Sequence, residues 1–301
     1  LRSGDMRAES KVKKGKGKVG TIVLFLALPV LLLIVFTYIP FVDMFKNSLT
    51  DWDGISETSN FVGLKNYIRL FTDSQYLSVF KNTFHYLIGA VLQIAFALFL
   101  AYIVSAKYRG ADFYKGVIFF PALLNGVAVS MIFLFFYREG GPLDDILVAL
   151  GHNADTLPHW IGDSHMVNLS LVFAMLWRYI GQNVIVFSGA ILSTDKVALE
   201  EAKLDGATDW QRFIYIVLPR LKPTIAVGMI LAVKNAISIF EIPFIITGGE
   251  NGSSTFVVQT IKTAFDSRKA GMASAMGIVL LVIILVISII QNKYGVSEED
   301  E

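Results

Sequence analysis

The sequence predicts an all-α protein that crosses a membrane six times. Of its 301 residues, 54% are hydrophobic and only 17% are charged, whereas about 25% are charged in an ordinary globular chain. The charged residues leave stretches of about 20 apolar residues, the length that a helix needs to cross a bilayer. The chain contains no cysteine, which excludes disulfides and thiolate metal sites. Its net charge of +1 gives no reason to expect a nucleic-acid partner.

Six segments are long enough to serve as spans. Four of them contain no charged residue: Val19–Ile39, Asn82–Ala106, Val117–Tyr137 and Gly271–Gln291. Two more segments carry charged residues in their interior. Val167–Ile191 contains Arg178, and Thr224–Ile246 contains Lys234 and Glu241. We therefore expect one six-span domain over residues 19–295.

The distribution of lysine and arginine predicts the orientation of these spans. Residues 1–18, 107–116, 192–223 and the C-terminal tail together carry 16 Lys and Arg, whereas the segments on the opposite side carry 8. Because basic residues are enriched in cytoplasmic loops, we expect a multi-pass protein of the cell membrane with both termini in the cytoplasm. Residues 1–18 would form a basic tail and 296–301 an acidic one. Residues 1–5 precede Met6 and are expected to be a remnant of cloning.

The cytoplasmic loop 192–223 is expected to form two short helices. Ser193 or Thr194 would cap a first helix over Asp195–Asp205, which Gly206 ends because glycine adopts positive φ without steric cost. Thr208 and Gln211 have the spacing of a capping box for a second helix, which Leu218-Pro219 would stop. An apolar face on the second helix is predicted from these residues: Trp210, Phe213, Ile214 and Val217. The pair would either meet a partner or rest on lipid headgroups.

The same loop carries a spaced motif. Glu200-Glu201-Ala202 is followed after three residues by Gly206, and after nine more by Ile216-x-Leu218-Pro219. This resembles E-A-A-x3-G-x9-I-x-L-P, the loop signature of membrane subunits of binding-protein-dependent ABC importers, and departs from it at Glu201, where the family has alanine. Further residues resemble the sugar-importer version: Leu204, Asp205, Ala207, Trp210, Phe213, Pro223, the segment 60–67 before span two, Asn82-Thr83, Thr247-Gly248-Gly249 and Ser254-Thr255.

The resemblance implies the six-span fold of type I ABC-importer permeases, a sugar or oligosaccharide substrate and a set of partners. These would be a second homologous permease, two ATPase subunits and an extracytoplasmic solute-binding protein. It also implies that the loop docks on an ATPase through these residues: Glu200, Glu201, Ala202, Asp205, Gly206 and Ala207. The chain has no phosphate-binding loop of the form G-x4-G-K-[ST]. We therefore expect a transport subunit rather than an enzyme, with no cofactor of its own and with ATP and Mg on the partner ATPases.

Polar side chains inside spans four and five are candidates for the substrate path, because such groups are costly in hydrocarbon unless they have a function or a partner. Lys234, Ser238 and Glu241 have i, i+4, i+7 spacing, which predicts one polar stripe on a helix. Arg178 or Lys234 would either pair with Glu241 or line the path. The residues expected to contact substrate are Tyr179, Gln182, Asn183, Asn235, Ser238 and Glu241.

Other functions remain open from the sequence alone. The same architecture could import a polyol, a sugar phosphate or a peptide. An ion-coupled secondary carrier would use Lys234 and Glu241 as coupling groups, and a scaffold without transport would leave the polar stripe unexplained. Gly248, Gly249 and Gly252 predict a flexible exit from span five. The resemblance implies that this loop reaches toward a docked binding protein, and the alternative is a simple connector.

Overall fold

The computed structural model describes residues 21–105, 110–194 and 196–295. The basic tail, the remnant predicted at residues 1–5, Asp195 and the acidic tail lie outside these ranges. The described part contains five helices that are long and apolar enough to cross a membrane, or six when one bent pair counts as a single span. This agrees with the prediction of six spans.

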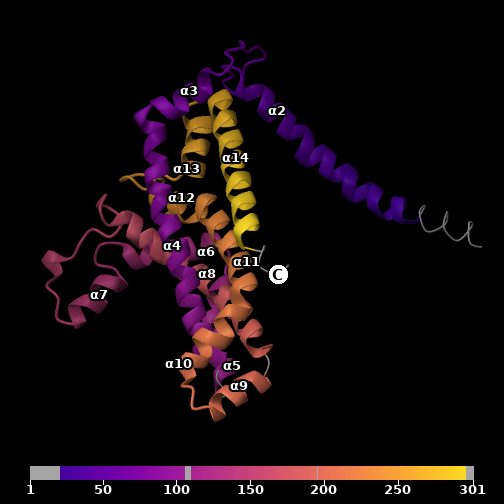
Figure 1. The fold of residues 1–301 in the computed structure, drawn as a ribbon. Helices are drawn as coiled ribbons and strands as arrows, with labels where there is room; N and C mark the ends of the chain where they lie inside the picture. The colour runs from indigo at the N-terminus through magenta and orange to yellow at the C-terminus, as the bar shows by residue number, and fades with distance from the viewer. Residues whose placement is uncertain (1–20, 106–109, 195, 296–301) are drawn as a thin grey trace, which may run out of the picture.

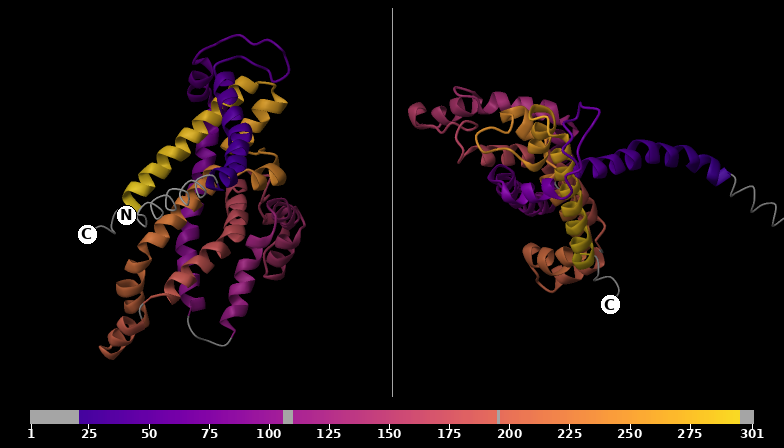
Figure 2. Two further views of the ribbon diagram at one scale, coloured as in Figure 1. Left: turned by 90° about the vertical axis from the view of Figure 1, so that its right-hand side faces the viewer. Right: turned by 90° about the horizontal axis from the view of Figure 1, so that it is seen from above.

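The first apolar helix, Thr21–Ser48, ends with the π-helical η1 (Ile34–Tyr38) and α2 (Ile39–Ser48). It stands away from the other helices over most of its length (Figures 1 and 2). The remaining long helices are α4 (Ser74–Ser105), α8 (Val167–Leu192), α11 (Leu218–Ile237) and α14 (Ala270–Gly295). The shorter ones are α3 (Lys65–Thr72), α5 (Ala111–Leu123), α6 (Gly126–Tyr137), α7 (Pro142–Ala149), η2 (Ala154–Thr156), α9 (Lys196–Leu204), α10 (Asp209–Arg212), η3 (Phe213–Val217), α12 (Glu241–Thr247), α13 (Phe256–Ile261) and η4 (Lys262–Asp266).

The main core forms around α8, which packs against α4, α5 and α11. Its largest fully buried side chains include Tyr86 of α4 and Leu171, Met175 and Phe187 of α8. Helices α9 and α10 lie at one end of the bundle and α3 lies at the other, whereas α12 lies between these ends (Figure 1). The bundle therefore places loop 192–223 and α3 on opposite sides of the region around α12.

The third predicted span is not one straight helix. It consists of α5 and α6, whose axes differ by 98°. The bend occurs at Leu124, which has an extended backbone, and at Asn125, whose side chain accepts a hydrogen bond from Val127 N–H (2.9 Å) and so caps α6. A search for stretches without charged residues does not detect this bend, because Asn125 is itself uncharged. It favours a helix start only through the hydrogen bond that its side chain accepts.

The fifth predicted span is also broken. Helix α11 ends at Ile237, and α12 begins at Glu241. The prediction of a single polar stripe over Lys234, Ser238 and Glu241 is therefore wrong, because i, i+4, i+7 spacing aligns side chains only on a continuous helix. Lys234 is exposed in the described chain, whereas Ser238 and Glu241 face a cavity that is described below.

The expected stop at Leu218-Pro219 is likewise wrong. The chain passes from α10 through the π-helical η3 into α11 without leaving helical conformation. Proline removes a backbone N–H and its ring crowds the carbonyl of the preceding turn, which normally breaks a helix. Here the preceding turn is widened, because Leu218 N–H bonds to Phe213 O, five residues back. Pro219 then falls in the first turn of α11, where the missing N–H has little cost.

Candidate functional site

A cavity of about 250 Å³ opens at the break between α11 and α12, where the chain faces α8. Tyr179 of α8, Asn235 of α11, and Ser238 and Glu241 from the break are among its lining residues, as predicted for the substrate path. Gln182, Asn183 and Lys234 are not among the lining residues in the described chain; Gln182 and Lys234 are exposed and Asn183 is half-buried. The lining residues in the part of the chain that the structure describes are Arg178, Tyr179, Asn235, Ser238, Ile239, Phe240, Glu241 and Ile242.

An ion pair between Arg178 of α8 and Glu241 of α12 lies in the wall of this cavity. The Arg178 side chain is 16% exposed and that of Glu241 is 40% exposed. The Arg178 guanidinium also lies over the ring of Tyr179, 4.9 Å from the ring centre, in a cation–π contact. Of the two pairings open from the sequence, the structure thus forms Arg178–Glu241 and not Lys234–Glu241.

Gly126, the first residue of α6, lies directly against this ion pair. A Cβ atom at this position would overlap both the Glu241 carboxylate and the Arg178 guanidinium. The absence of a side chain therefore lets the N-terminus of α6 approach the carboxylate. This end of a helix carries partial positive charge, which stabilises a nearby carboxylate. The break in span three and the break in span five consequently meet at one ion pair.

Sequence reasoning did not identify Asn125 and Gly126 as part of this site. The Asn-Gly dipeptide that they form, inside an otherwise apolar run, is a signal for a turn or a helix start. The dipeptide lies inside the predicted span Val117–Tyr137. Because this span is about 20 residues long and contains no charged residue, an unbroken helix was expected there.

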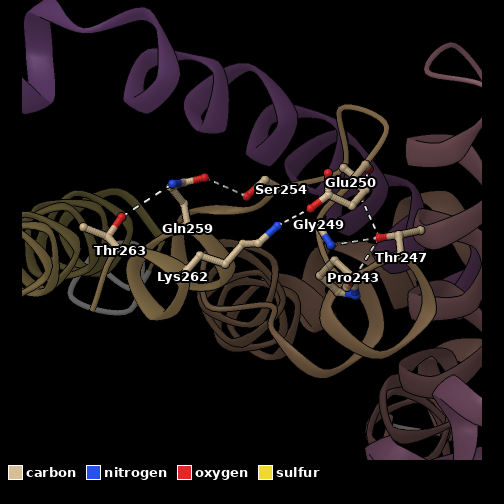
Figure 3. A network of polar contacts seen from close by, with 9 residues as sticks. Pro243, Thr247, Gly249, Glu250, Ser254, Gln259, Lys262 and Thr263 are labelled. Carbon is tan, nitrogen blue, oxygen red and sulfur yellow. Dashed lines mark hydrogen bonds and ion pairs between the residues drawn. The ribbon is translucent and has the colours of Figure 1, made fainter. Parts of the chain in front are cut away.

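The loop that follows α12 is held by a network of polar contacts (Figure 3). Thr247 Oγ1 bonds to Pro243 O (2.8 Å) and to Ser253 Oγ (2.6 Å), and Gly249 N–H donates to Thr247 Oγ1 (3.2 Å). Lys262 is paired with Glu250, and its ammonium group, hydrogen-bonded to that carboxylate, lowers the pKa of Glu250. These bonds hold the loop together internally, and the flexible exit predicted from three glycines stays a prediction.

Two buried asparagines attach this loop to the bundle. Asn82 of α4 donates from Nδ2 to Ser254 O (2.9 Å), and Asn168 of α8 donates from Nδ2 to Gly252 O (3.0 Å). Both side chains come from helices that also form the main core, and both residues are less than 10% exposed. The position of the loop at the C-terminal end of α12 is thus set by α4 and α8.

Replacing Asn82 and Asn168 with alanine together is expected to loosen residues 248–255. Each replacement removes one hydrogen bond to a loop carbonyl, which contributes about 0.5–1.5 kcal/mol, so the two together contribute about 1–3 kcal/mol. Hydrogen exchange of the loop amides measures this, and we expect them to exchange at least tenfold faster. Asn153→Ala, which removes an amide from an exposed turn, is the control. Unchanged protection of the loop in the double variant would contradict the anchoring role.

The predicted coupling residues lie at the end of the bundle that holds α9 and α10. Gly206 follows α9 with φ +84°, so the predicted αL position is confirmed. Thr208 Oγ1 accepts from Gln211 N–H (3.2 Å) while Gln211 Oε1 accepts from Thr208 N–H (2.8 Å), which confirms the capping box. The side chains of Ser193 and Thr194 instead donate back to Ala190 O of α8, at 2.8 and 3.4 Å.

The six coupling residues divide into an exposed set and two half-buried alanines. Ala202 and Ala207 are half-buried and joined by a backbone bond from Ala207 N–H to Ala202 O (2.9 Å). The exposed set consists of Glu200, Glu201, Asp205 and Gly206. The apolar side of the following helix is used within the chain, where Phe213 packs on Tyr102 with ring centres 4.6 Å apart. The exposed set is consequently presented away from the bundle core.

Comparison with known proteins agrees with this architecture. Residues 93–294 match the family described as binding-protein-dependent transport system inner membrane component. The probable ABC transporter permease protein YurN of Bacillus subtilis is 32% identical over 91% of this chain and 95% of its own length. The multiple sugar-binding transport system permease protein MsmF of Streptococcus mutans is 29% identical over 89% of this chain and 93% of its own.

A solved structure has the same fold. It is a bacterial alginate ABC transporter in complex with an alginate pentasaccharide-bound periplasmic protein, and one of its chains superposes with a TM-score of 0.82 at 20% identity, covering 93% of this chain and 95% of that one. The matched family region runs from the middle of α4 to the end of α14 and contains both helix breaks, the ion pair and loop 192–223. The chain belongs to the family of inner membrane components of binding-protein-dependent transport systems, and it is a transport subunit rather than an enzyme.

Proposed function

We propose that this chain is the permease subunit of an ATP-driven importer of a sugar or oligosaccharide, with the cavity at the α11–α12 break as part of the substrate path. The observation that carries the proposal is the meeting of two broken spans at a polar cavity. Broken membrane helices expose backbone and polar groups, and transporters place their substrate sites at such breaks. Tyr179, Asn235 and Ser238 would contact the solute there.

The chemistry of this cavity favours an uncharged, hydroxylated solute. An amide, a hydroxyl and a phenol ring offer hydrogen bonds and an aromatic face among apolar neighbours, which suits the hydroxyl groups and faces of a sugar. Arg178 is neutralised by Glu241, and Lys234 is not part of the lining. Among the described residues, the lining therefore offers no unpaired cation to a sugar phosphate, which favours a neutral saccharide over that alternative. The names of the relative MsmF and of the alginate transporter support a carbohydrate.

A second homologous permease is the proposed partner within the membrane. Lys234 lies in α11, inside a predicted span, and its side chain is exposed in the isolated chain. A charged side chain that faces hydrocarbon costs several kcal/mol. We therefore infer that a protein surface or a water-filled path between two subunits covers this side of α11.

The other proposed partners lie at the two ends of the bundle. Two ATPase subunits, which carry ATP and Mg, would bind loop 192–223 in the cytoplasm. With this orientation, we expect both termini in the cytoplasm and the loop after α12 facing the side of the solute-binding protein. An ion-coupled carrier is less well supported, because Glu241, the carboxylate that it would need as a coupling group, is already paired with Arg178.

Replacing Asn235 with alanine is expected to lower uptake at limiting substrate about tenfold, because one bidentate hydrogen-bonding group is lost from the path. Gln182→Ala is the matched control, since it also removes one amide but lies outside the cavity lining. Uptake of labelled solute into vesicles that contain the whole transporter is the measurement. An equal loss in both variants, or no loss in Asn235→Ala, would contradict this placement of the path.

The substrate class has its own test. A thermal-shift screen of saccharides, polyols and sugar phosphates on the binding protein of the same system identifies the solute, and we expect a neutral saccharide to give the largest stabilisation. Uptake of that saccharide must then depend on ATP hydrolysis by the assembled complex. Transport by this chain without an ATPase subunit would overturn the proposal in favour of a carrier.

A further inference from the structure

A second cavity, of about 260 Å³, lies at the end of the bundle opposite to loop 192–223. It is formed where three apolar spans end or begin, namely at Ser48, Ser74 and Ala270. Three basic side chains are among its lining residues, Lys65 and Arg69 of α3 and Lys269 just before α14. The rest of the lining consists of Asp51, Trp52, Val62, Asn66 and Met272.

The walls of this cavity are held in place by hydrogen bonds. Asn66 Nδ2 donates to Ser48 O (2.9 Å) and to Thr50 O (2.8 Å), which fixes α3 against the loop after α2. Gly271 N–H donates to Trp52 O (2.8 Å) and so fixes the start of α14 against the same loop. The basic residues are therefore brought together by the fold rather than by chance proximity of mobile side chains.

The charges in the cavity are incompletely balanced. Arg69 Nε lies 3.5 Å from Asp73. Asp51 accepts hydrogen bonds from Asn60 N–H (2.7 Å) and Asn60 Nδ2 (3.1 Å), and these bonds lower the pKa of its carboxyl group. No carboxylate in the described ranges forms an ion pair with Lys65 or Lys269. Two ammonium groups and one carboxylate remain, so the cavity is complementary to an anion.

An apolar stripe runs beside the basic residues on the same helix. Leu64, Ile68 and Phe71 have i, i+4, i+7 spacing and are 64%, 63% and 54% exposed. Lys65 and Arg69 follow Leu64 and Ile68 by one position, so the basic stripe lies about 100° around the helix from the apolar one. A helix with such adjacent faces, at the ends of membrane spans, is typical of the membrane interface.

We propose that this cavity binds the phosphate of an anionic phospholipid, whose acyl chains lie along Leu64, Ile68 and Phe71. An amphiphile satisfies both observations at once, because its phosphate matches the two ammonium groups and its chains cover the exposed apolar stripe. Trp52, in the cavity wall, is of the residue type that is enriched at the interface between membrane and water. A soluble anion or an acidic protein surface would leave the apolar stripe exposed.

Native mass spectrometry of the complete transporter with added phosphatidylglycerol tests this proposal. K65Q/K269Q removes both ammonium groups that would bond the phosphate, and because charge-assisted hydrogen bonds are about twice as strong as neutral ones, we expect this variant to retain at least tenfold less phosphatidylglycerol. Lys46→Gln combined with Arg268→Gln removes two nearby charges outside the cavity lining, which make no such bond and are screened by salt, so this variant should retain the lipid within about twofold. I68Q keeps the ammonium groups and should weaken phosphatidylglycerol binding.

Three results would overturn the proposal. The first is an equal loss of lipid from the cavity variant and the control variant. The second is displacement of the lipid by inorganic phosphate at equal concentration, which would indicate a site for a free anion. The third is unchanged lipid retention in K65Q/K269Q together with lost stimulation by the solute-binding protein, which would indicate a protein-docking surface. None of these results depends on which solute the transporter carries.

Discussion

Replacing Gly206 with leucine is expected to abolish the stimulation of ATP hydrolysis by substrate-loaded binding protein, while the chain still inserts and assembles. Gly206 has φ +84°, and apart from its chain neighbours no atom of the described residues lies within 4 Å of the position that a Cβ would occupy. A side chain here would therefore not clash with the described part of this subunit. We expect it to hinder the approach of the ATPase, whose docking on the exposed loop requires a thin surface at this position.

A series of substitutions separates steric hindrance from backbone strain. A side chain other than asparagine costs roughly 1–2 kcal/mol in the left-handed region, and asparagine costs less. Gly206→Ala adds strain with little bulk, whereas Gly206→Asn adds bulk with little strain. If steric hindrance of docking causes the loss of stimulated hydrolysis, Gly206→Asn should lose more of it than Gly206→Ala. If backbone strain causes the loss, Gly206→Ala should lose more.

A control for strain alone is available at Gly110. This residue has φ +93°, and apart from its chain neighbours the nearest described atom to a Cβ there is a ring atom of Tyr114 at 3.8 Å. Gly110→Leu therefore carries a similar backbone cost outside the coupling residues, and we expect it to keep stimulated hydrolysis. Stimulated hydrolysis and uptake measured in reconstituted vesicles decide the matter, and wild-type values for Gly206→Leu would reject the coupling role of this loop.

Breaking the Arg178–Glu241 pair is expected to reduce uptake more than tenfold and to destabilise the assembled complex. Removing one partner of a buried pair costs about 3–5 kcal/mol. Glu241 is 40% exposed, and water screens the remaining charge, so we expect about 1–3 kcal/mol for Arg178→Met. Loss of this ion pair is expected to lower transport because the pair joins α8 to the start of α12, beside the N-terminus of α6.

The double variant Arg178→Met with Glu241→Leu separates stability from transport. Replacing both charges with apolar groups removes the unpaired carboxylate, so thermal stability is expected to return close to the wild-type value. Uptake should remain low, because the carboxylate at the N-terminus of α6 is absent. Lys262→Met, which breaks the exposed pair with Glu250, is the control and should change stability by less than about 1 kcal/mol. Wild-type uptake in the double variant would show that transport does not need these charges.

Several features of the fold and of the coupling loop could be predicted because they depend on residues close in sequence. The bounds of α8 and α14 agree with the predicted spans to within a few residues, since the length of an apolar run is set by the thickness of a bilayer. The positive φ of Gly206 and the Thr208–Gln211 capping box were predicted because each depends on a single turn of helix.

The substrate-path residues were predicted less evenly. Asn235 and Tyr179 line the cavity, whereas Gln182, three residues after Tyr179, is exposed. Three-residue spacing places two side chains near each other on a helix, but only the neighbouring helices decide which of them faces a cavity. Because α11 ends at Ile237, the helical spacing that related Lys234 to Glu241 does not apply.

By itself, the sequence determined that the chain spans a membrane and where along the chain the loop with the importer motif lies. Both are properties of composition and of short spacing. Only the tertiary structure decided that spans three and five break and that both breaks meet at Arg178 and Glu241, with Gly126 against them. These residues lie 52 to 115 positions apart, and the contact between them depends on how α6, α8 and α12 pack, which no local pattern in the chain encodes.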